Sequence, residues 1–194
     1  MIKKHLQLVP ILLLAFLLLT SKAFTEGLVT DETGYLTPQE IDTLSLMCKE
    51  IEDRYGFLVI IRVVNKTPGY TQSDSDAGYY GLRQYAADYY DAKYPGKDGV
   101  IFAVRFSDRW YVSVTTGKGI SILTTEKLDK CEDRVNPFLR AGRYYDAFRI
   151  YLQQIVSTLE MDSCVIPEMY PFTYFLDVNL DSEKLLPVVP DPME

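Results

Sequence analysis

An aspartate and a glycine-rich turn are the residues of this chain whose types and spacing suit the binding of an ion. Asp98 directly precedes a long apolar run, and a Thr-Gly-Lys-Gly turn lies further along the chain at residues 116–119. Carboxylate and carbonyl oxygens are the ligands that Ca²⁺ prefers, and glycine lets a backbone approach an ion closely. We therefore predict a calcium site with metal ligands at Asp98, Asp91 and Asp88, and a binding loop formed by Gly99, Thr116, Gly117, Lys118, Gly119, Thr125 and Glu126.

The same residues also fit a purely structural role. Asp98-Gly99 is typical of a turn that leads into a strand, and Gly117 and Gly119 can supply left-handed backbone angles. Asp88 and Asp91 would then be solvated side chains on a helix. The sequence leaves both interpretations open.

A predicted β-hairpin brings these groups to one place. Residues 100–106 are apolar except for Arg105, which is typical of a strand buried on both faces. Residues 110–116 alternate in polarity, with Val112 and Val114 on one side, and a turn at residues 107–108 joins the two strands. Because a hairpin returns to the edge where it began, we expect Asp98 and the glycine turn to lie side by side.

The rest of the chain predicts helices packed on this sheet. A capping box at residues 37–40 starts a helix that ends at Gly56, and a buried strand follows at 57–64. A second helix, with Asp76 as its N-cap, runs to about residue 93. A third is closed by Pro137 and Gly142, and a fourth ends near residue 160. The predicted fold class is α/β: a mixed, mostly buried β-sheet, made of a parallel β-α-β unit and an antiparallel hairpin, with helices on both faces.

The N-terminal residues predict export. Residues 1–23 combine a positive start, an apolar stretch and a small-x-small ending, which is typical of a signal peptide cleaved after Ala23. An uncleaved anchor is the alternative, but the apolar stretch is short for a membrane span and contains Pro10. We expect a secreted, extracytoplasmic protein without a transmembrane anchor, divided into a signal peptide (1–23), one domain (24–160) and a proline-rich tail (161–194) partly docked on that domain.

Net charge and histidine content exclude or disfavour several classes of function. Cleavage would leave 17 basic residues against 27 acidic ones, a net charge of −10, which disfavours nucleic acid and favours a cation or a basic partner. The only histidine, His5, lies in the predicted signal peptide, so Ser-His-Asp catalysis, Cys-His catalysis and histidine-ligated zinc are excluded for the mature chain. We expect Cys48 and Cys131 to pack in the core and Cys164 to be a free thiol, with an internal disulfide left open.

Six short motifs in this order resemble the TPM domain family over residues 28–159. They occupy residues 29–36, 85–91, 98–100, 108–111, 116–119 and 142–148. The resemblance implies an exported domain; some members bind calcium and some are weak acid phosphatases. It also implies an aspartate near the start of the third helix, where this chain has Thr125.

From these observations we expect a binding or assembly module at the cell envelope, calcium-binding at the predicted site, with an envelope or extracellular protein as partner. The alternative is a weak metal-dependent acid phosphatase, and the sequence leaves open whether the chain is an enzyme at all. Tyr80 and Tyr90, on the second helix, are either part of a partner surface or packed under the tail.

Overall fold

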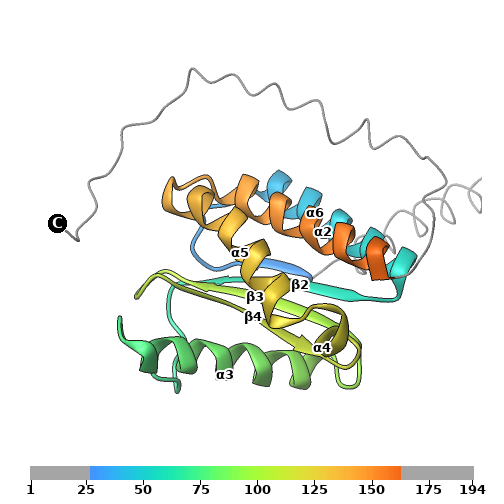
Figure 1. The fold of residues 1–194 in the computed structure, drawn as a ribbon. Coiled ribbons are helices and arrows are strands. Elements are labelled where there is room, and N and C mark those ends of the chain that lie inside the picture. Colours follow the sequence, from blue (N-terminus) through green and yellow to red (C-terminus); the bar gives the residue numbers. More distant parts are fainter. Residues whose placement is uncertain (1–26, 163–194) are drawn as a thin grey trace, which may run out of the picture.

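The computed structural model describes residues 27–162, which fold into three layers (Figure 1). A four-stranded sheet lies in the middle, α3 covers one of its faces, and α2, α5 and α6 cover the other. In chain order the elements are β1 (Val29–Asp31), α2 (Pro38–Tyr55), β2 (Leu58–Val64), α3 (Asp76–Lys93), β3 (Gly99–Arg105), β4 (Trp110–Thr116), α4 (Gly119–Ile122), α5 (Thr125–Arg140) and α6 (Tyr144–Asp162).

The strands follow one another across the sheet in the order β1-β2-β3-β4. β1, β2 and β3 are parallel, whereas β4 is antiparallel to β3. The predicted α/β class, with its parallel β-α-β unit, its hairpin and helices on both faces, is confirmed. β1 adds a fourth strand that the sequence did not indicate, because three residues are too few to display a strand periodicity.

Local sequence signals set the ends of α2. Thr37 and Glu40 form the predicted capping box: the Thr37 side chain accepts from the Glu40 amide, and the Glu40 carboxylate accepts from the Thr37 amide at 2.7 Å. Gly56 ends the helix in the left-handed conformation, with φ of 62°. Both predicted boundaries of this helix are confirmed.

Two predicted helix boundaries are wrong by a few residues. Asp76 is the first residue of α3, and the N-cap position is taken by Ser75, whose extended backbone precedes the helix. Pro137 lies inside α5 and does not close it. The helix continues to Arg140, and Gly142 follows with φ of 71°. A proline costs one backbone hydrogen bond, and the packing of α5 along α6 outweighs that loss.

The core lies on both sides of the sheet and includes most of β2 and β3. On the α6 side, Phe102 stacks on Tyr151 with ring centroids 4.3 Å apart, and Phe148 meets Phe102 edge-on. Cys48 and Cys131 are buried, as predicted, whereas Cys164 lies outside the described residues. Within residues 27–162 no helix is both long and apolar enough to cross a membrane.

Candidate functional site

Asp98 and the glycine turn meet at one edge of the sheet, where β3 begins and β4 ends. Gly99, at the start of β3, pairs with Thr116, at the end of β4, so the residues flanking this pair are neighbours. The Lys118 amide donates to Asp98 Oδ1 at 2.9 Å, and Lys118 Nζ lies 3.5 Å from Asp98 Oδ2. We call this group, Asp98 with residues 116–119, the Asp98 rim. It is the arrangement that the hairpin prediction requires.

The two glycines of the turn are required by close contacts. Gly117 has φ of 56°, and a Cβ atom on it would lie 2.1 Å from Asp98 Oδ1. A Cβ atom on Gly119 would lie 2.4 Å from the carbonyl oxygen of Gly99. The left-handed backbone explains the glycine at position 117 but not the one at 119. Gly119 is needed because its backbone touches that of Gly99.

The carbonyl of Lys97 ties the rim to α3. It accepts from Thr116 Oγ1 at 3.0 Å and from Tyr90 Oη at 3.4 Å. Tyr90 is buried, and desolvation raises the pKa of its phenol to about 12. The hypothesis that Tyr90 belongs to a partner surface is therefore wrong, whereas Tyr80 is 63% exposed.

The electrostatics of the rim favour an ionised Asp98. The backbone hydrogen bond from Lys118 is the main reason why the pKa of Asp98 is lowered, and the Lys118 charge adds to this effect. The side chain of Lys118 is 79% exposed and that of Asp98 is 31% exposed. At neutral pH the rim thus presents a fixed carboxylate beside a solvated ammonium group.

The other predicted metal ligands lie on α3. Asp88 accepts from Tyr70 Oη at 2.9 Å and from Gln84 Nε2 at 2.8 Å, and Asp91 is an exposed residue of the same helix. Residues 27–162 contain no group of three or more acidic, cysteine or histidine side chains that could hold a metal ion. The structure therefore does not gather Asp88, Asp91 and Asp98 into one ligand set.

Thr125 and Glu126 open α5, and the short helix α4, which begins at Gly119, lies between them and the glycine turn in the chain. Thr124, which has extended backbone, occupies the N-cap position, so Thr125 is the first helical residue. Glu126 is highly exposed and pairs with Lys130 at 2.7 Å, which lowers the pKa of Glu126. Its carboxylate is thus engaged along its own helix.

The opposite edge of the sheet, where β3 ends and β4 begins, holds a buried ion pair. Its two residues were not among the predicted site residues. Arg105, at the end of β3, is fully buried and donates to Asp108 through Nε at 2.8 Å and Nη2 at 2.6 Å. It also donates to Thr67 Oγ1 and to the carbonyl of Gly78. We call these four residues the Arg105 lock. A signal for it was present in the sequence: Arg105 is the one charge in the apolar run, and an aspartate follows three residues later.

The lock also fixes the loop between β2 and α3. The Ser73 amide donates to Asp108 Oδ2 at 3.0 Å, and the Ser73 carbonyl accepts from Trp110 Nε1 at 2.7 Å. A shallow hollow of about 380 Å³ lies over this junction, lined by Lys66, Gln72, Ser73, Asp74, Ser107 and Asp108. The inner groups of this edge hold one another, so their role is structural.

A third polar group lies between β4 and the helices. Ser113 Oγ donates to Glu132 Oε1 at 2.7 Å and accepts from Tyr151 Oη at 3.1 Å. Burial raises the pKa of Glu132. No sequence pattern indicates this contact, because Glu132 sits in an ordinary charged stretch of α5 and its partner is on a distant strand.

Comparisons with known proteins identify the fold and the family. The family model described as TPM domain matches residues 29–158. Several solved structures are similar to this chain, including the following three. The N-terminal domain of the cg2496 protein from Corynebacterium glutamicum is 14% identical, with a TM-score of 0.52, over 69% of this chain and 80% of that one.

The second is the N-terminal domain of a protein from P. gingivalis, 18% identical with a TM-score of 0.55, over 72% of this chain and 86% of that one. The third is the BA42 protein from Bizionia argentinensis, 15% identical with a TM-score of 0.53, over 68% and 86%. At these identities the likeness concerns the fold alone. No curated protein matches the chain. Because the family model covers more than half of the sequence, the chain belongs to the TPM domain family.

Proposed function

We propose that this chain is an exported TPM domain that acts as a binding and assembly module at the cell envelope, and that the Asp98 rim is the surface it offers to a partner. One observation carries the proposal: the Lys118 amide holds the Asp98 carboxylate while the Lys118 ammonium stands in solvent beside it. The rim is a preformed pair of charges on a rigid hairpin. Preformed contact groups lower the ordering cost of binding.

The same carboxylate is less suited to acid–base catalysis. A general acid or base works best when its pKa lies near the operating pH, and the pKa of Asp98 is held below its ordinary value. Binding through fixed charges needs no such match. The rim therefore supports a binding role better than the alternative of a weak metal-dependent acid phosphatase.

The export part of the proposal rests on residues 1–23, which lie outside the described residues. Their pattern is that of a cleaved signal peptide, and the remaining chain, with 17 basic and 27 acidic residues, carries a net charge of −10. Such a chain attracts cations and basic surfaces. We therefore propose as the partner an envelope or extracellular protein whose contact patch is basic opposite Asp98 and carries one acidic group opposite Lys118.

We propose Ca²⁺ as the ion that tunes this rim. Asp98 Oδ2 lies 3.5 Å from the exposed ammonium group of Lys118, so a cation can replace that group without breaking the amide bond to Oδ1. Turn carbonyls and water would complete the six to eight oxygens that Ca²⁺ takes. With one carboxylate in the set we expect weak, millimolar binding.

A thermal melt with added calcium tests the ion. Binding to the folded state raises the melting temperature of the wild type, and chelator reverses the rise. Asp98→Asn should lose the response, whereas Asp88→Asn, on α3, should keep it. A wild type that does not respond to millimolar calcium rules out calcium and leaves the binding role standing.

Pull-down from envelope extracts tests the binding role itself. Wild-type protein should retain one defined partner, and Lys118→Glu should lose it. Lys66→Glu is the matched control, because it makes the same charge change at an exposed position on the opposite edge of the sheet. Equal capture by all three proteins would exclude the Asp98 rim as the contact surface.

Phosphate release at acid pH tests the enzymatic alternative. If the wild type turns over a phosphate ester and Asp98→Ala does not, the rim is catalytic and the phosphatase hypothesis replaces ours. Equal rates for the two proteins would show that the release comes from a contaminant.

A further inference from the structure

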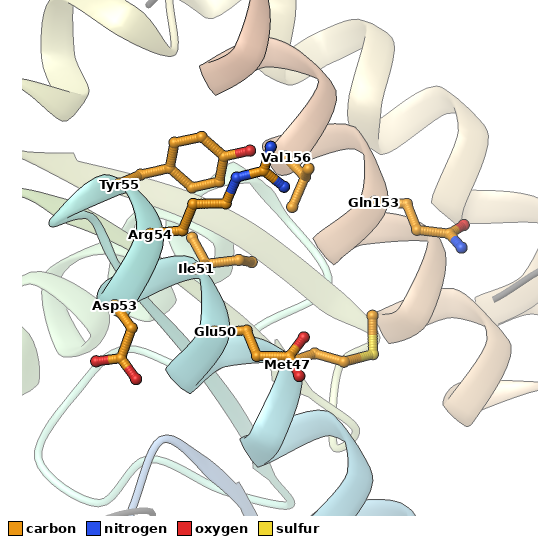
Figure 2. Close-up of a pocket in the computed structure, with 8 residues that line it drawn as sticks. All are labelled: Met47, Glu50, Ile51, Asp53, Arg54, Tyr55, Gln153 and Val156. Atoms are coloured by element: carbon orange, nitrogen blue, oxygen red, sulfur yellow. The ribbon is translucent and has the colours of Figure 1, made fainter. Parts of the chain in front are cut away.

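A groove lies between α2 and α6 on the helical layer of the domain (Figure 2). It has a volume of about 430 Å³, and α2 supplies Met47, Ile51 and Tyr55 while α6 supplies Gln153 and Val156. Three charged residues of α2, Glu50, Asp53 and Arg54, also line it. The groove lies on the helical layer and is separate from the Asp98 rim.

The chain leaves the described domain beside this groove. The ends of α2 and α6 are tied together, because Glu160 accepts from Tyr55 Oη at 3.0 Å and pairs with Arg54 at 3.5 Å. Figure 1 shows the two helices side by side up to these ends. Met161, in the last turn of α6, is 69% exposed. The segment that follows Asp162 therefore starts close to an apolar hollow.

That segment is itself apolar. Residues 163–176 lie outside the described residues, and nine of these fourteen are apolar or aromatic while Glu168 is the only charge. Left in water, such a stretch would be an unusually large apolar surface for a secreted chain. The α2/α6 groove offers such a segment a hydrophobic surface close to the point where it begins.

We propose that residues 163–176 fold back and fill the α2/α6 groove, with the aromatic side chains of Tyr170, Phe172, Tyr174 and Phe175 against Met47 and Val156. The distance is short: Val156 lies about 9 Å along the helix axis from Asp162, at a rise of about 1.5 Å per residue. An extended chain covers about 3.3 Å per residue, so the aromatic residues reach the groove with length to spare. Because the segment is tethered at the groove, its effective concentration there is in the millimolar range.

Methionine methyl spectra of the full-length mature protein test this contact. Replacing Phe172, Tyr174 and Phe175 by Ser removes the aromatic rings and should shift the Met47 methyl resonance, since ring currents act only at close range. Replacing Leu185, Leu186 and Val188 by Ser changes the same tail at a distance and should leave Met47 unchanged. Neither variant alters the described domain, so both remain informative whatever the tail does.

Proteolysis provides an independent measurement. If the groove holds the segment, chymotrypsin should cleave the wild type between Tyr170 and Phe175 about tenfold more slowly than Val156→Glu, because cleavage requires the released state. Val156 is half-buried at the groove, and a melting curve shows whether the variant stays folded.

An unchanged Met47 resonance in the aromatic variant overturns the proposal. A Met47 resonance that depends on protein concentration also overturns it, because a second copy would then occupy the groove. Equal cleavage of folded Val156→Glu and wild type contradicts it as well.

Discussion

The two edges of the sheet are built from the same kind of contact but differ in burial. At one edge the Asp98 carboxylate binds the turn that follows β4, and at the other Asp108 binds Arg105 and the loop before α3. Both contacts hold an end of the β3–β4 hairpin. The side chain of Lys118 is 79% exposed, whereas those of Arg105 and Asp108 are 0% and 6% exposed.

This difference separates a structural contact from one that can serve a partner. Exposed ion pairs contribute about 0–1 kcal/mol, because water already solvates both charges. Breaking a buried pair leaves a charge without solvent or partner and costs about 3–5 kcal/mol. The Arg105 lock therefore holds the fold, while the Asp98 rim is free to exchange its weak internal contact for an external one.

The largest expected effect is that of Arg105→Met. Asp108 would stay buried without its cation, and Thr67 and the Gly78 carbonyl would lose their donor. We expect a loss of about 3–5 kcal/mol in the free energy of unfolding, measured in urea.

The matched control for that experiment is Arg109→Met. Arg109 is exposed, and its replacement makes the same change in charge and size at the hairpin turn. The cost should be within about 0.5 kcal/mol. If the two variants lose the same stability, the Arg105 lock is not what distinguishes this edge.

The next largest effect is that of Gly119→Ala at the exposed edge. The added methyl would meet the Gly99 carbonyl at 2.4 Å, so backbone must move. We expect a loss of about 1–3 kcal/mol in the free energy of unfolding, as for other overpacked sites.

Gly96→Ala separates this steric cost from backbone strain, because Gly96 has φ of 73° but nothing within 4 Å of the added atom. A smaller loss for Gly119→Ala than for Gly96→Ala would mean that the two segments do not touch closely.

The sequence predicted one edge well and the other poorly for a physical reason. The Asp98 rim follows from chain connectivity alone, since a hairpin must return to where it started. The Arg105 lock joins three segments whose spacing is set by how α3 and its preceding loop pack. Arg105 stood out as a charge in a buried strand, but its partners Thr67 and Gly78 belong to segments whose path no local pattern reveals.

The same limit applies to the predicted metal ligands. The helical period correctly placed Asp88 and Asp91 on α3, but not the direction in which Asp88 points. Tyr70, in the loop before the helix, binds its carboxylate. The starts of two helices show a similar contrast. The capping box of α2 fixed the first residue of that helix correctly. Ser75 and Asp76 are both residue types that suit an N-cap, so residue type did not identify the N-cap of α3.

Glu132 is half-buried, so it is intermediate in burial between the exposed Asp98 rim and the buried Arg105 lock. Burial raises its pKa in the folded state, so the folded chain binds this proton more tightly than the unfolded chain. Its contribution to stability is therefore greatest below the unfolded pKa of about 4.5 and falls as the pH rises through the folded pKa. Glu132→Gln removes the charge and keeps an acceptor for Ser113, so it should stabilise the protein at pH 7 by on the order of 1 kcal/mol.

Urea unfolding at pH 4 and pH 7 measures this effect. The gain for Glu132→Gln should be present at pH 7 and largely lost at pH 4, where Glu132 of the wild type is protonated. Asp133→Asn, an exposed neighbour on the same helix, should show no such difference. A gain that is equal at both pH values would point to packing instead of charge.

The smallest effect should come from Asp98→Asn, and its sign reverses that of Glu132→Gln. The amide oxygen of the new side chain would still accept from the Lys118 backbone, so the variant loses only the charge. The pKa of Asp98 is lowered on folding, so its contribution is present above the unfolded pKa of about 3.8 and is lost as the pH falls through the folded pKa. We expect a slightly lower melting temperature at pH 7, a difference that shrinks at pH 2 and in high salt.

Melting curves of the wild type and Asp98→Asn at these pH values, with and without salt, measure this difference. A large, salt-independent loss at pH 7 would show that the Asp98 rim behaves like the Arg105 lock, and a Lys118 ammonium group held so firmly by Asp98 could not be displaced by a cation or a partner.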